Sequence, residues 1–257
     1  MAGTEDALSV RIGRFTVGEH LARAVAARRL IAHDDGTWEL PAKSGRGVPD
    51  IWLHNERSSS CQQLFFFLFG AAYGMSCVPQ GCRNCYKVKI SPANLRQLVA
   101  VQEVTKGVPY RSKCGPELFI PYSTGHYAAF FYLNGLEQAR AAFAELRRMV
   151  DGKPRLGAGV PMLIKRGCTD YEIHCGPSDR YAFAPPEVEA WLLERLRPSK
   201  QIRSQPRSVT FARWIQIAFQ IGDETYLDFT GGRRLYPKVL TYDPAPTEET
   251  GIRGTDR

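Results

Sequence analysis

The sequence lacks several features that would assign it to a broad class of protein. Its longest apolar stretch, residues 64–78, is interrupted by Gly70, Gly74 and Ser76 and is shorter than the roughly 20 residues that span a bilayer. The first ten residues do not show the charged and then apolar pattern of a secretory signal. There is no block of five or more consecutive like charges and no internal repeat. We therefore expect a cytoplasmic protein with no membrane partner.

What the chain does contain is typical of a folded globular protein with a basic surface. It has 257 residues, of which 44% are hydrophobic and 23% are charged, and its formal net charge is +8. A basic protein is attracted to the phosphate groups of nucleotides and nucleic acids. The expected partners are therefore a small-molecule or nucleotide-like anionic substrate, with nucleic acid as the alternative.

The N-terminal part of the chain predicts a small separate element. Residues 16–32 have apolar positions near helical spacing, and residues 30–40 predict a hairpin that turns at Asp35 and Gly36. The expected organisation is an N-terminal helix–hairpin element with a linker over residues 1–50, an α/β domain over 51–242 and a flexible tail over 243–257.

The middle of the chain predicts an α/β fold. A buried strand at residues 127–132 is followed by an amphipathic helix at 136–150 and by a second buried strand at 160–165. Such a βαβ unit implies parallel strands joined by a right-handed crossover. We expect a partial barrel or an open, mostly parallel sheet, with the small N-terminal helix–hairpin element attached.

A cluster of cysteines is the strongest chemical signal in the sequence. Cys77, Cys82 and Cys85 form a C-x4-C-x2-C run, Gly81 lets the loop curl, and Cys114 follows downstream. The chain has seven cysteines, and an odd number with such close spacing favours metal binding over a disulfide framework. We expect three of the sulfurs to converge on one point, as ligands of a metal or cluster.

This cysteine pattern resembles the patterns of two iron–sulfur families. The spacing of Cys77, Cys82, Cys85 and Cys114 resembles that of plant-type ferredoxins, whose loop holds a [2Fe–2S] cluster. A three-thiol loop followed by a helix also resembles radical S-adenosylmethionine enzymes, although their usual spacing is C-x3-C-x2-C and Asn84 stands at their aromatic position. The second resemblance favours a [4Fe–4S] cluster. It further implies S-adenosylmethionine as a cosubstrate, an electron donor protein, and redox or radical enzyme chemistry.

The fourth ligand and the metal itself stay open. Cys114 either completes the site or leaves one iron open to substrate, and Cys168 and Cys175 are the other candidates for the fourth thiol. Cys82-x2-Cys85 is also half of a four-thiolate zinc site. The alternative function is therefore a zinc-stabilised nucleic-acid-binding protein.

A second candidate site follows the predicted βαβ unit. If the segment is extended, Cys168, Asp170, Glu172 and His174 point to one face, because side chains alternate along a strand. Asp170, Glu172 and His174 are then candidate catalytic residues, as polar contacts to substrate or as proton carriers.

Basic residues flank this polar segment. We expect Lys165, Arg166 and Arg180 to bind the phosphate or carboxylate of a cofactor or substrate. The predicted substrate pocket spans residues 165–180 and adjoins the cysteine loop.

Overall fold

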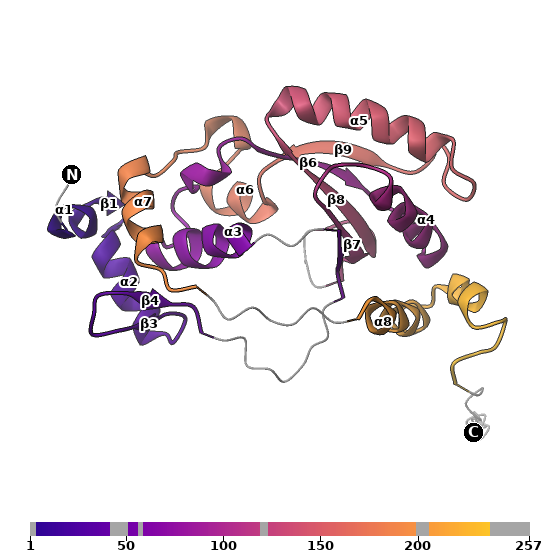
Figure 1. Cartoon of the computed structure of the whole chain (residues 1–257), viewed down its shortest axis with the longest axis horizontal. Helices are drawn as coiled ribbons and strands as arrows, with labels where there is room; N and C mark the ends of the chain where they lie inside the picture. Colours follow the sequence, from indigo (N-terminus) through magenta and orange to yellow (C-terminus); the bar gives the residue numbers. More distant parts are fainter. Residues whose placement is uncertain (1–3, 42–50, 56–58, 119–122, 199–205, 237–257) are drawn as a thin grey trace, which may run out of the picture.

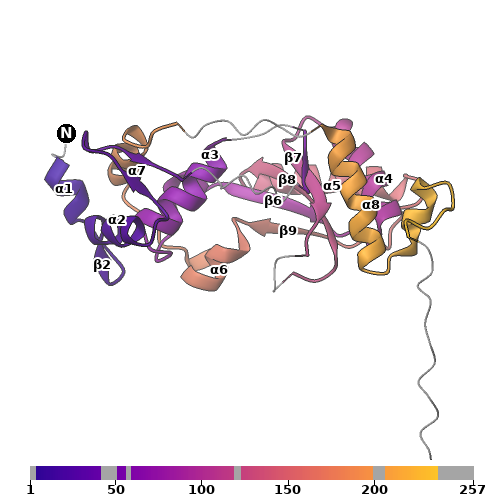
Figure 2. The ribbon, with the colours of Figure 1, turned by 90° about the horizontal axis from the view of Figure 1, so that it is seen from below.

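The computed structural model describes residues 4–41, 51–55, 59–118, 123–198 and 206–236. The predicted tail and most of the predicted linker lie outside these residues. The described part is elongated, with the N-terminal elements at one end, a β-sheet in the middle and a helix, α8 (Arg207–Gln220), near the other end (Figures 1 and 2).

The central sheet has five strands in the order β5-β7-β8-β6-β9, and every neighbouring pair is antiparallel. Its strands are β5 (Leu53–His54), β6 (Cys85–Ile90), β7 (Ser112–Pro116), β8 (Tyr127–Asn134) and β9 (Met162–Arg166). The mixed α/β class is confirmed, but the expectation of mostly parallel pairing is wrong. β8 and β9 do run in the same direction, yet β6 lies between them and pairs with both.

The order of elements explains this difference. The chain runs β6, α4 (Leu95–Lys106), β7, β8, α5 (Leu136–Asp151) and β9, so that each helix connects two strands separated by a third. This is the double split-βαβ arrangement, also called ferredoxin-like. A strand–helix–strand pattern in a sequence specifies the direction of the two strands, but it does not specify whether a later or earlier strand is inserted between them.

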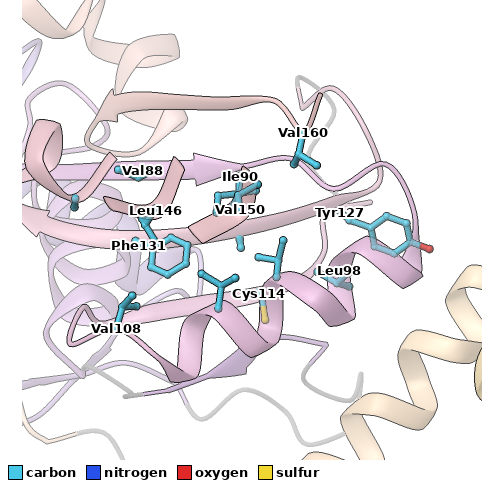
Figure 3. Close-up of a cluster of buried hydrophobic side chains, with 14 of the residues drawn as sticks. Val88, Ile90, Leu98, Val108, Cys114, Tyr127, Phe131, Leu146, Val150 and Val160 are labelled. Atoms are coloured by element: carbon cyan, nitrogen blue, oxygen red, sulfur yellow. The ribbon is translucent and has the colours of Figure 1, made fainter. Parts of the chain in front are cut away.

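Helices α4 and α5 cover one face of the sheet and build the main core. Val88 and Ile90 of β6 and Phe131 of β8 are fully buried there. Leu98 of α4 and Leu146 of α5 pack against them (Figure 3). We call this side of the sheet the helix-covered face.

The C-terminal helices close one edge of this core. Trp214 of α8 is fully buried, and its Nε1 donates a hydrogen bond of 2.7 Å to the carbonyl of Ile51 beside β5. Asp223 precedes the 3-10 helix η4 (Glu224–Phe229) and accepts hydrogen bonds from the Leu95 amide and the Tyr127 hydroxyl, each at 2.6 Å. These contacts fix the start of α4 relative to the sheet.

The N-terminal elements form a second core together with two later helices. The predicted helix and hairpin are present as α2 (Val17–Ala26) and the pair β3 (Ile31–Ala32) and β4 (Trp38–Glu39). They pack with the helices η1 (Gln63–Ala72) and α7 (Pro186–Glu194). The remaining elements of this end are α1 (Thr4–Ser9), β1 (Arg11–Ile12), β2 (Phe15–Thr16) and α3 (Ser59–Gln62).

A third, smaller cluster joins the two cores. Helix α6 (Thr169–Cys175) follows β9, and its Tyr171 packs against Phe69 of η1 with ring centres 4.6 Å apart. The short 3-10 helices η2 (Gln80–Cys82) and η3 (Ser178–Arg180) lie on the connecting loops. Among the described residues, no helix is both long and apolar enough to cross a membrane.

Candidate functional site

The second face of the sheet carries cations and aromatic rings in place of aliphatic side chains. Because side chains alternate along a strand, the neighbours of the core residues Val88, Ile90 and Phe131 point to this side. They are Lys87, Lys89, Phe130 and Tyr132. Lys113 pairs in register with Phe130, and Lys165 pairs with Lys87, so both lie on the same side, which we call the polar face.

The cations of the polar face lie over its aromatic rings. Lys113 Nζ is 4.1 Å from the ring centre of Trp52 and 5.3 Å from that of Phe130. Lys89 Nζ is 5.5 Å from the Phe130 ring centre, and Lys87 Nζ is 5.4 Å from that of Tyr132. A cation over a ring face is attracted by the ring quadrupole, so the rings hold the ammonium groups in fixed places.

A cavity of about 220 Å³ opens on this face. Its floor is the sheet, and its walls are the start of α6 with Cys168, Thr169 and Asp170 on one side and Trp52 near β5 on another. The charged residues that line it are Lys87, Lys113, Lys165, Glu117 and Asp170. The lining therefore has more ammonium groups than carboxylates.

Lys87 is the most deeply buried cation in the cavity. Only 7% of the residue is exposed, and Nζ lies 3.2 Å from the Sγ of Cys168. Burial lowers the pKa of the Lys87 ammonium, but the neighbouring Cys168 and Tyr132 raise it, and the net shift is upward. Lys87 therefore contributes a fixed positive charge to the cavity wall.

Lys165 lies in the field of this charge. Burial lowers the pKa of Lys165, and the ammonium of Lys87 lowers it further, against the opposing effect of Glu172. Its Nζ donates to the Thr169 hydroxyl and lies 3.9 Å from the Glu172 carboxylate. Two ammonium groups that repel each other in a partly buried site make that site attractive to an anion.

Glu117 is held at the edge of the cavity by direct bonds. Its Oε2 lies 2.6 Å from Lys89 Nζ, and it also accepts from the Ser123 hydroxyl. Because this carboxylate is already paired with Lys89, it offsets the charge of that lysine rather than the charges of Lys87 and Lys165.

The cysteine loop approaches one end of the polar face and is fixed by a carboxylate of α7. Glu189 is 6% exposed and accepts from the amides of Gln80 and Gly81 at 2.6 and 2.7 Å. The Tyr73 hydroxyl also lies 3.4 Å from Glu189. A buried carboxylate that receives two N–H groups holds the loop backbone in one conformation.

Two of the predicted metal ligands lie near each other. Burial raises the pKa of Cys82 to about 12, while the Tyr171 hydroxyl, 3.4 Å from its Sγ, opposes this shift. Burial also raises the pKa of Cys85, and Cys168 and Cys61 add to the rise for both thiols. The thiols of Cys61 and Cys168 are therefore close enough to Cys82 and Cys85 to affect their pKa.

The other two predicted ligands lie elsewhere, which corrects the four-cysteine expectation. Cys114 pairs in register with Ala129, which pairs with Ile90, and its side chain belongs to the helix-covered core (Figure 3). Cys77 belongs to the core of the N-terminal elements, where the thiol that affects its pKa is Cys175. The sheet separates Cys114 from Cys85, because the two side chains leave opposite faces.

The predicted set Cys77, Cys82, Cys85 and Cys114 is therefore not assembled in the structure. Within the ranges that the structure describes, no group of three or more histidine, cysteine, aspartate or glutamate side chains is arranged to hold a metal ion. The residues present do not fit the predicted cluster, and no chemical step is assigned to it.

The predicted second site is helical rather than extended. Residues 169–175 form α6, so Cys168, Asp170, Glu172 and His174 do not share a face. The segment Cys168 to Asp170 lines the cavity, whereas His174 packs against Phe69 with ring centres 6.1 Å apart. The extended interpretation failed because a polar–apolar alternation over seven residues is too short to exclude about two turns of helix.

The three cations predicted to bind an anion, Lys165, Arg166 and Arg180, lie in different surroundings. Lys165 lines the cavity. Arg166 donates to the carbonyls of Arg83 and Ser178 and lies over the rings of Tyr86, Tyr181 and Phe183. Arg180 is largely exposed and lies 3.9 Å from the neighbouring Asp179. Arg166 therefore holds the loop after α6 in place.

Most residues of the cavity were not among the predicted site residues. Lys87, Lys113, Phe130 and Tyr132 carry a signal that was available, because each stands one position from a buried apolar residue in a strand. Glu189 had no such signal, since its role depends on a loop about a hundred residues earlier in the chain.

No family model matches the chain, and comparisons with curated proteins and with solved structures find no match either.

Proposed function

We propose that this protein binds the sugar–phosphate backbone of single-stranded nucleic acid on the polar face, with one phosphate group in the cavity between Lys87, Lys113 and Lys165. The observation that carries the proposal is the set of ammonium groups that aromatic rings hold over one face of an antiparallel sheet. Binding of this kind needs no chemical step, so the proposed role is that of a binding protein.

The charge of the site favours phosphate. Lys87 is protonated and buried, and Lys165 lies close enough for its pKa to be lowered by that charge. A phosphate oxygen between them would relieve this repulsion and accept hydrogen bonds from both ammonium groups. The net charge of +8 adds a long-range attraction for any polyanion.

The shape of the site favours a single strand over a duplex. The cavity is recessed between α6 and the segment at Trp52, so a backbone must bend inward to reach its lysines. A flexible strand can do this, and its unpaired bases can also contact Trp52 and Tyr132, which are half-buried and line the cavity. Sheets with the split-βαβ order are known to bind single-stranded RNA in this way, which here is an analogy of fold alone.

The test is a fluorescence anisotropy titration with a labelled single-stranded oligonucleotide at several salt concentrations. For the double variant Lys113→Gln/Lys165→Gln we expect weaker binding and a salt dependence whose slope is reduced by about 0.7, because both lysines contact the same phosphate and one neutralised phosphate on a single strand contributes about that much. The matched control is Lys106→Gln, because Lys106 is exposed on α4 and pairs with Glu103.

Two results would overturn the proposal. One is an unchanged affinity in the folded double variant, with folding checked by circular dichroism. The other is an equal loss of affinity in the Lys106→Gln control, since that would mean a diffuse charge effect. Competition by nucleoside triphosphate or by duplex of the same sequence shows whether the phosphate comes from a strand: a duplex or a triphosphate that binds more tightly than the strand argues against it.

Iron–sulfur binding is kept as a second candidate function because Cys82 and Cys85 lie near Cys168 and Cys61. Anaerobic purification with analysis of iron, zinc and acid-labile sulfide tests it. Bound iron that is lost in Cys85→Ala but kept in Cys114→Ala would support this candidate with a new set of ligands. A colourless protein without iron would refute it, and one zinc per chain would favour the zinc alternative.

A further inference from the structure

A second basic cavity lies at the N-terminal end of the molecule and belongs to none of the sites discussed above. It has a volume of about 360 Å³ and lies between the β1–β2 hairpin, α2 and the turn after η1. Three arginines line it, Arg14, Arg23 and Arg29, together with His20. Among the residues that the structure describes, its lining contains no aspartate or glutamate.

The carboxylate nearest in sequence is already engaged. Glu19 forms the capping box at the start of α2, where it accepts from the Thr16 amide at 2.7 Å while its own amide donates to the Thr16 hydroxyl. The Glu19 carboxylate therefore has its hydrogen bonds within the capping box, and the described lining residues of the cavity include three guanidinium groups and no carboxylate.

The walls of this cavity are fixed by packing. The Arg23 guanidinium lies 4.2 Å from the ring centre of Phe15, and His20 Nε2 lies 2.9 Å from the carbonyl oxygen of Ile12. Gly74 has φ of +52°, and a Cβ there would lie 2.3 Å from two atoms of the His20 ring. The backbone turn thus approaches the imidazole more closely than any other residue would permit.

We propose that this arginine cavity binds the diphosphate group of a nucleotide. Guanidinium groups bind phosphate oxygens in pairs of parallel hydrogen bonds, and three of them match the charge of a nucleoside diphosphate. Gly70, Ala71 and Met75 provide an apolar wall for the rest of the ligand. This inference does not depend on the nucleic-acid proposal, because the two cavities share no residue.

Isothermal titration calorimetry with ADP, on the full chain, tests the inference. We expect the double variant Arg14→Gln/Arg29→Gln to bind ADP about a hundredfold more weakly or worse, since each of the two lost charged hydrogen-bond pairs contributes about a factor of ten or more. Arg28→Gln is the matched control, because Arg28 is next to Arg29 but does not line the cavity. Inorganic pyrophosphate should displace ADP.

A third variant keeps the test valid if the double variant does not fold. Ser76 is exposed at the cavity, and Ser76→Glu adds a carboxylate there without removing a core side chain, so it should weaken ADP binding as well. Lys113→Gln/Lys165→Gln should leave ADP affinity unchanged. No ADP binding by the wild type, no competition by pyrophosphate, or an equal loss in Arg28→Gln would each overturn the inference.

Discussion

Phe130 and Phe131 are neighbours in β8, yet they serve two different surfaces of the same sheet. Phe131 is fully buried among the aliphatic side chains of α4 and α5, whereas Phe130 lies under the ammonium groups of Lys89 and Lys113. The helix-covered face stabilises the fold by removing apolar surface from water. The polar face uses the same type of ring to position charge.

The difference between the two faces shows why β6, in which lysines alternate with valine and isoleucine, can be the central strand of the sheet. In β6, Val88 and Ile90 fill the core while Lys87 and Lys89 stand on the opposite side. A surface that consisted only of mutually repelling ammonium groups would be destabilising. The rings, Glu117 and Cys168 offset this repulsion, and what remains is a site for an anion.

The largest effect is expected from truncating the core ring. Phe131→Ala should lower the free energy of unfolding by about 3–5 kcal/mol, since it removes a buried ring and leaves a cavity. Phe130→Ala should cost less than half of that, because the lysines above it can move into the space or into water. Urea unfolding followed by circular dichroism compares the two, and equal losses would mean that the polar face is also a packed core.

A smaller effect is expected where β5 joins the sheet. A Cβ at Gly115 would lie 2.4 Å from the carbonyl oxygen of Ile51, so Gly115→Ala must push Ile51 and Trp52, which precede β5, away from β7. We expect a loss of about 1–3 kcal/mol, together with weaker oligonucleotide binding. Gly159→Ala is the control, because a Cβ there meets nothing within 4 Å; similar melting temperatures for both variants would contradict the prediction.

At alkaline pH, a thiol of the helix-covered face and a thiol of the polar face should contribute differently to the loss of stability. Burial raises the pKa of Cys114 to about 12, above the value of roughly 8.5 for an unfolded thiol. The unfolded chain therefore loses this proton first, so the stabilisation is complete below about pH 8.5 and is lost as the pH rises toward 12. The slope from this thiol is about −1.4 kcal/mol per pH unit.

The matched comparison is Cys85 on the polar face. Burial raises its pKa as well, but Lys87 and Arg111 oppose the shift. In urea titrations between pH 8 and 11, Cys114→Ala should flatten the decline in stability more than Cys85→Ala does. The reverse order would show that the cations of the polar face do not act on Cys85.

The smallest effect is expected from a single cation of the polar face. Lys113→Gln removes the ammonium group 4.1 Å from the Trp52 ring and should cost about 0.5–1 kcal/mol, typical of a cation–π contact near the surface. Differential scanning calorimetry measures this against Lys106→Gln, which should change stability by less than about 0.5 kcal/mol. An increase in stability for Lys113→Gln would mean that repulsion between the lysines exceeds their attraction to the rings.

The sequence predicted the local elements better than their assembly. The N-terminal helix and hairpin follow from apolar spacing and from the turn at Asp35 and Gly36, and both are present. The insertion of β6 between β8 and β9 could not be predicted from local sequence patterns, because it depends on pairing between residues far apart in the chain.

The cysteines illustrate the same limit at the level of the site. Their spacing predicted that Cys77, Cys82 and Cys85 converge, but nothing local showed that Cys114 leaves the opposite face of the sheet or that Cys168 and Cys61 affect the pKa of Cys82 and Cys85. Thiols far apart in sequence are brought together by strand pairing, and strand register decides which side each one takes.

The central position of β6 has a consequence for how the protein folds. Both partners of this strand come later in the chain, and Cys85 pairs with Asn134 while its neighbour Tyr86 pairs with Arg166. The chain between β6 and each of its partners must form a long loop before the central strands can pair. Such distant contacts slow folding, because the entropy of closing the loop is lost before the contacts form. During synthesis, Cys82 and Cys85 emerge well before β8 and before Tyr171 of α6, so the burial that raises the pKa of both thiols in the folded protein is absent until those elements have been made.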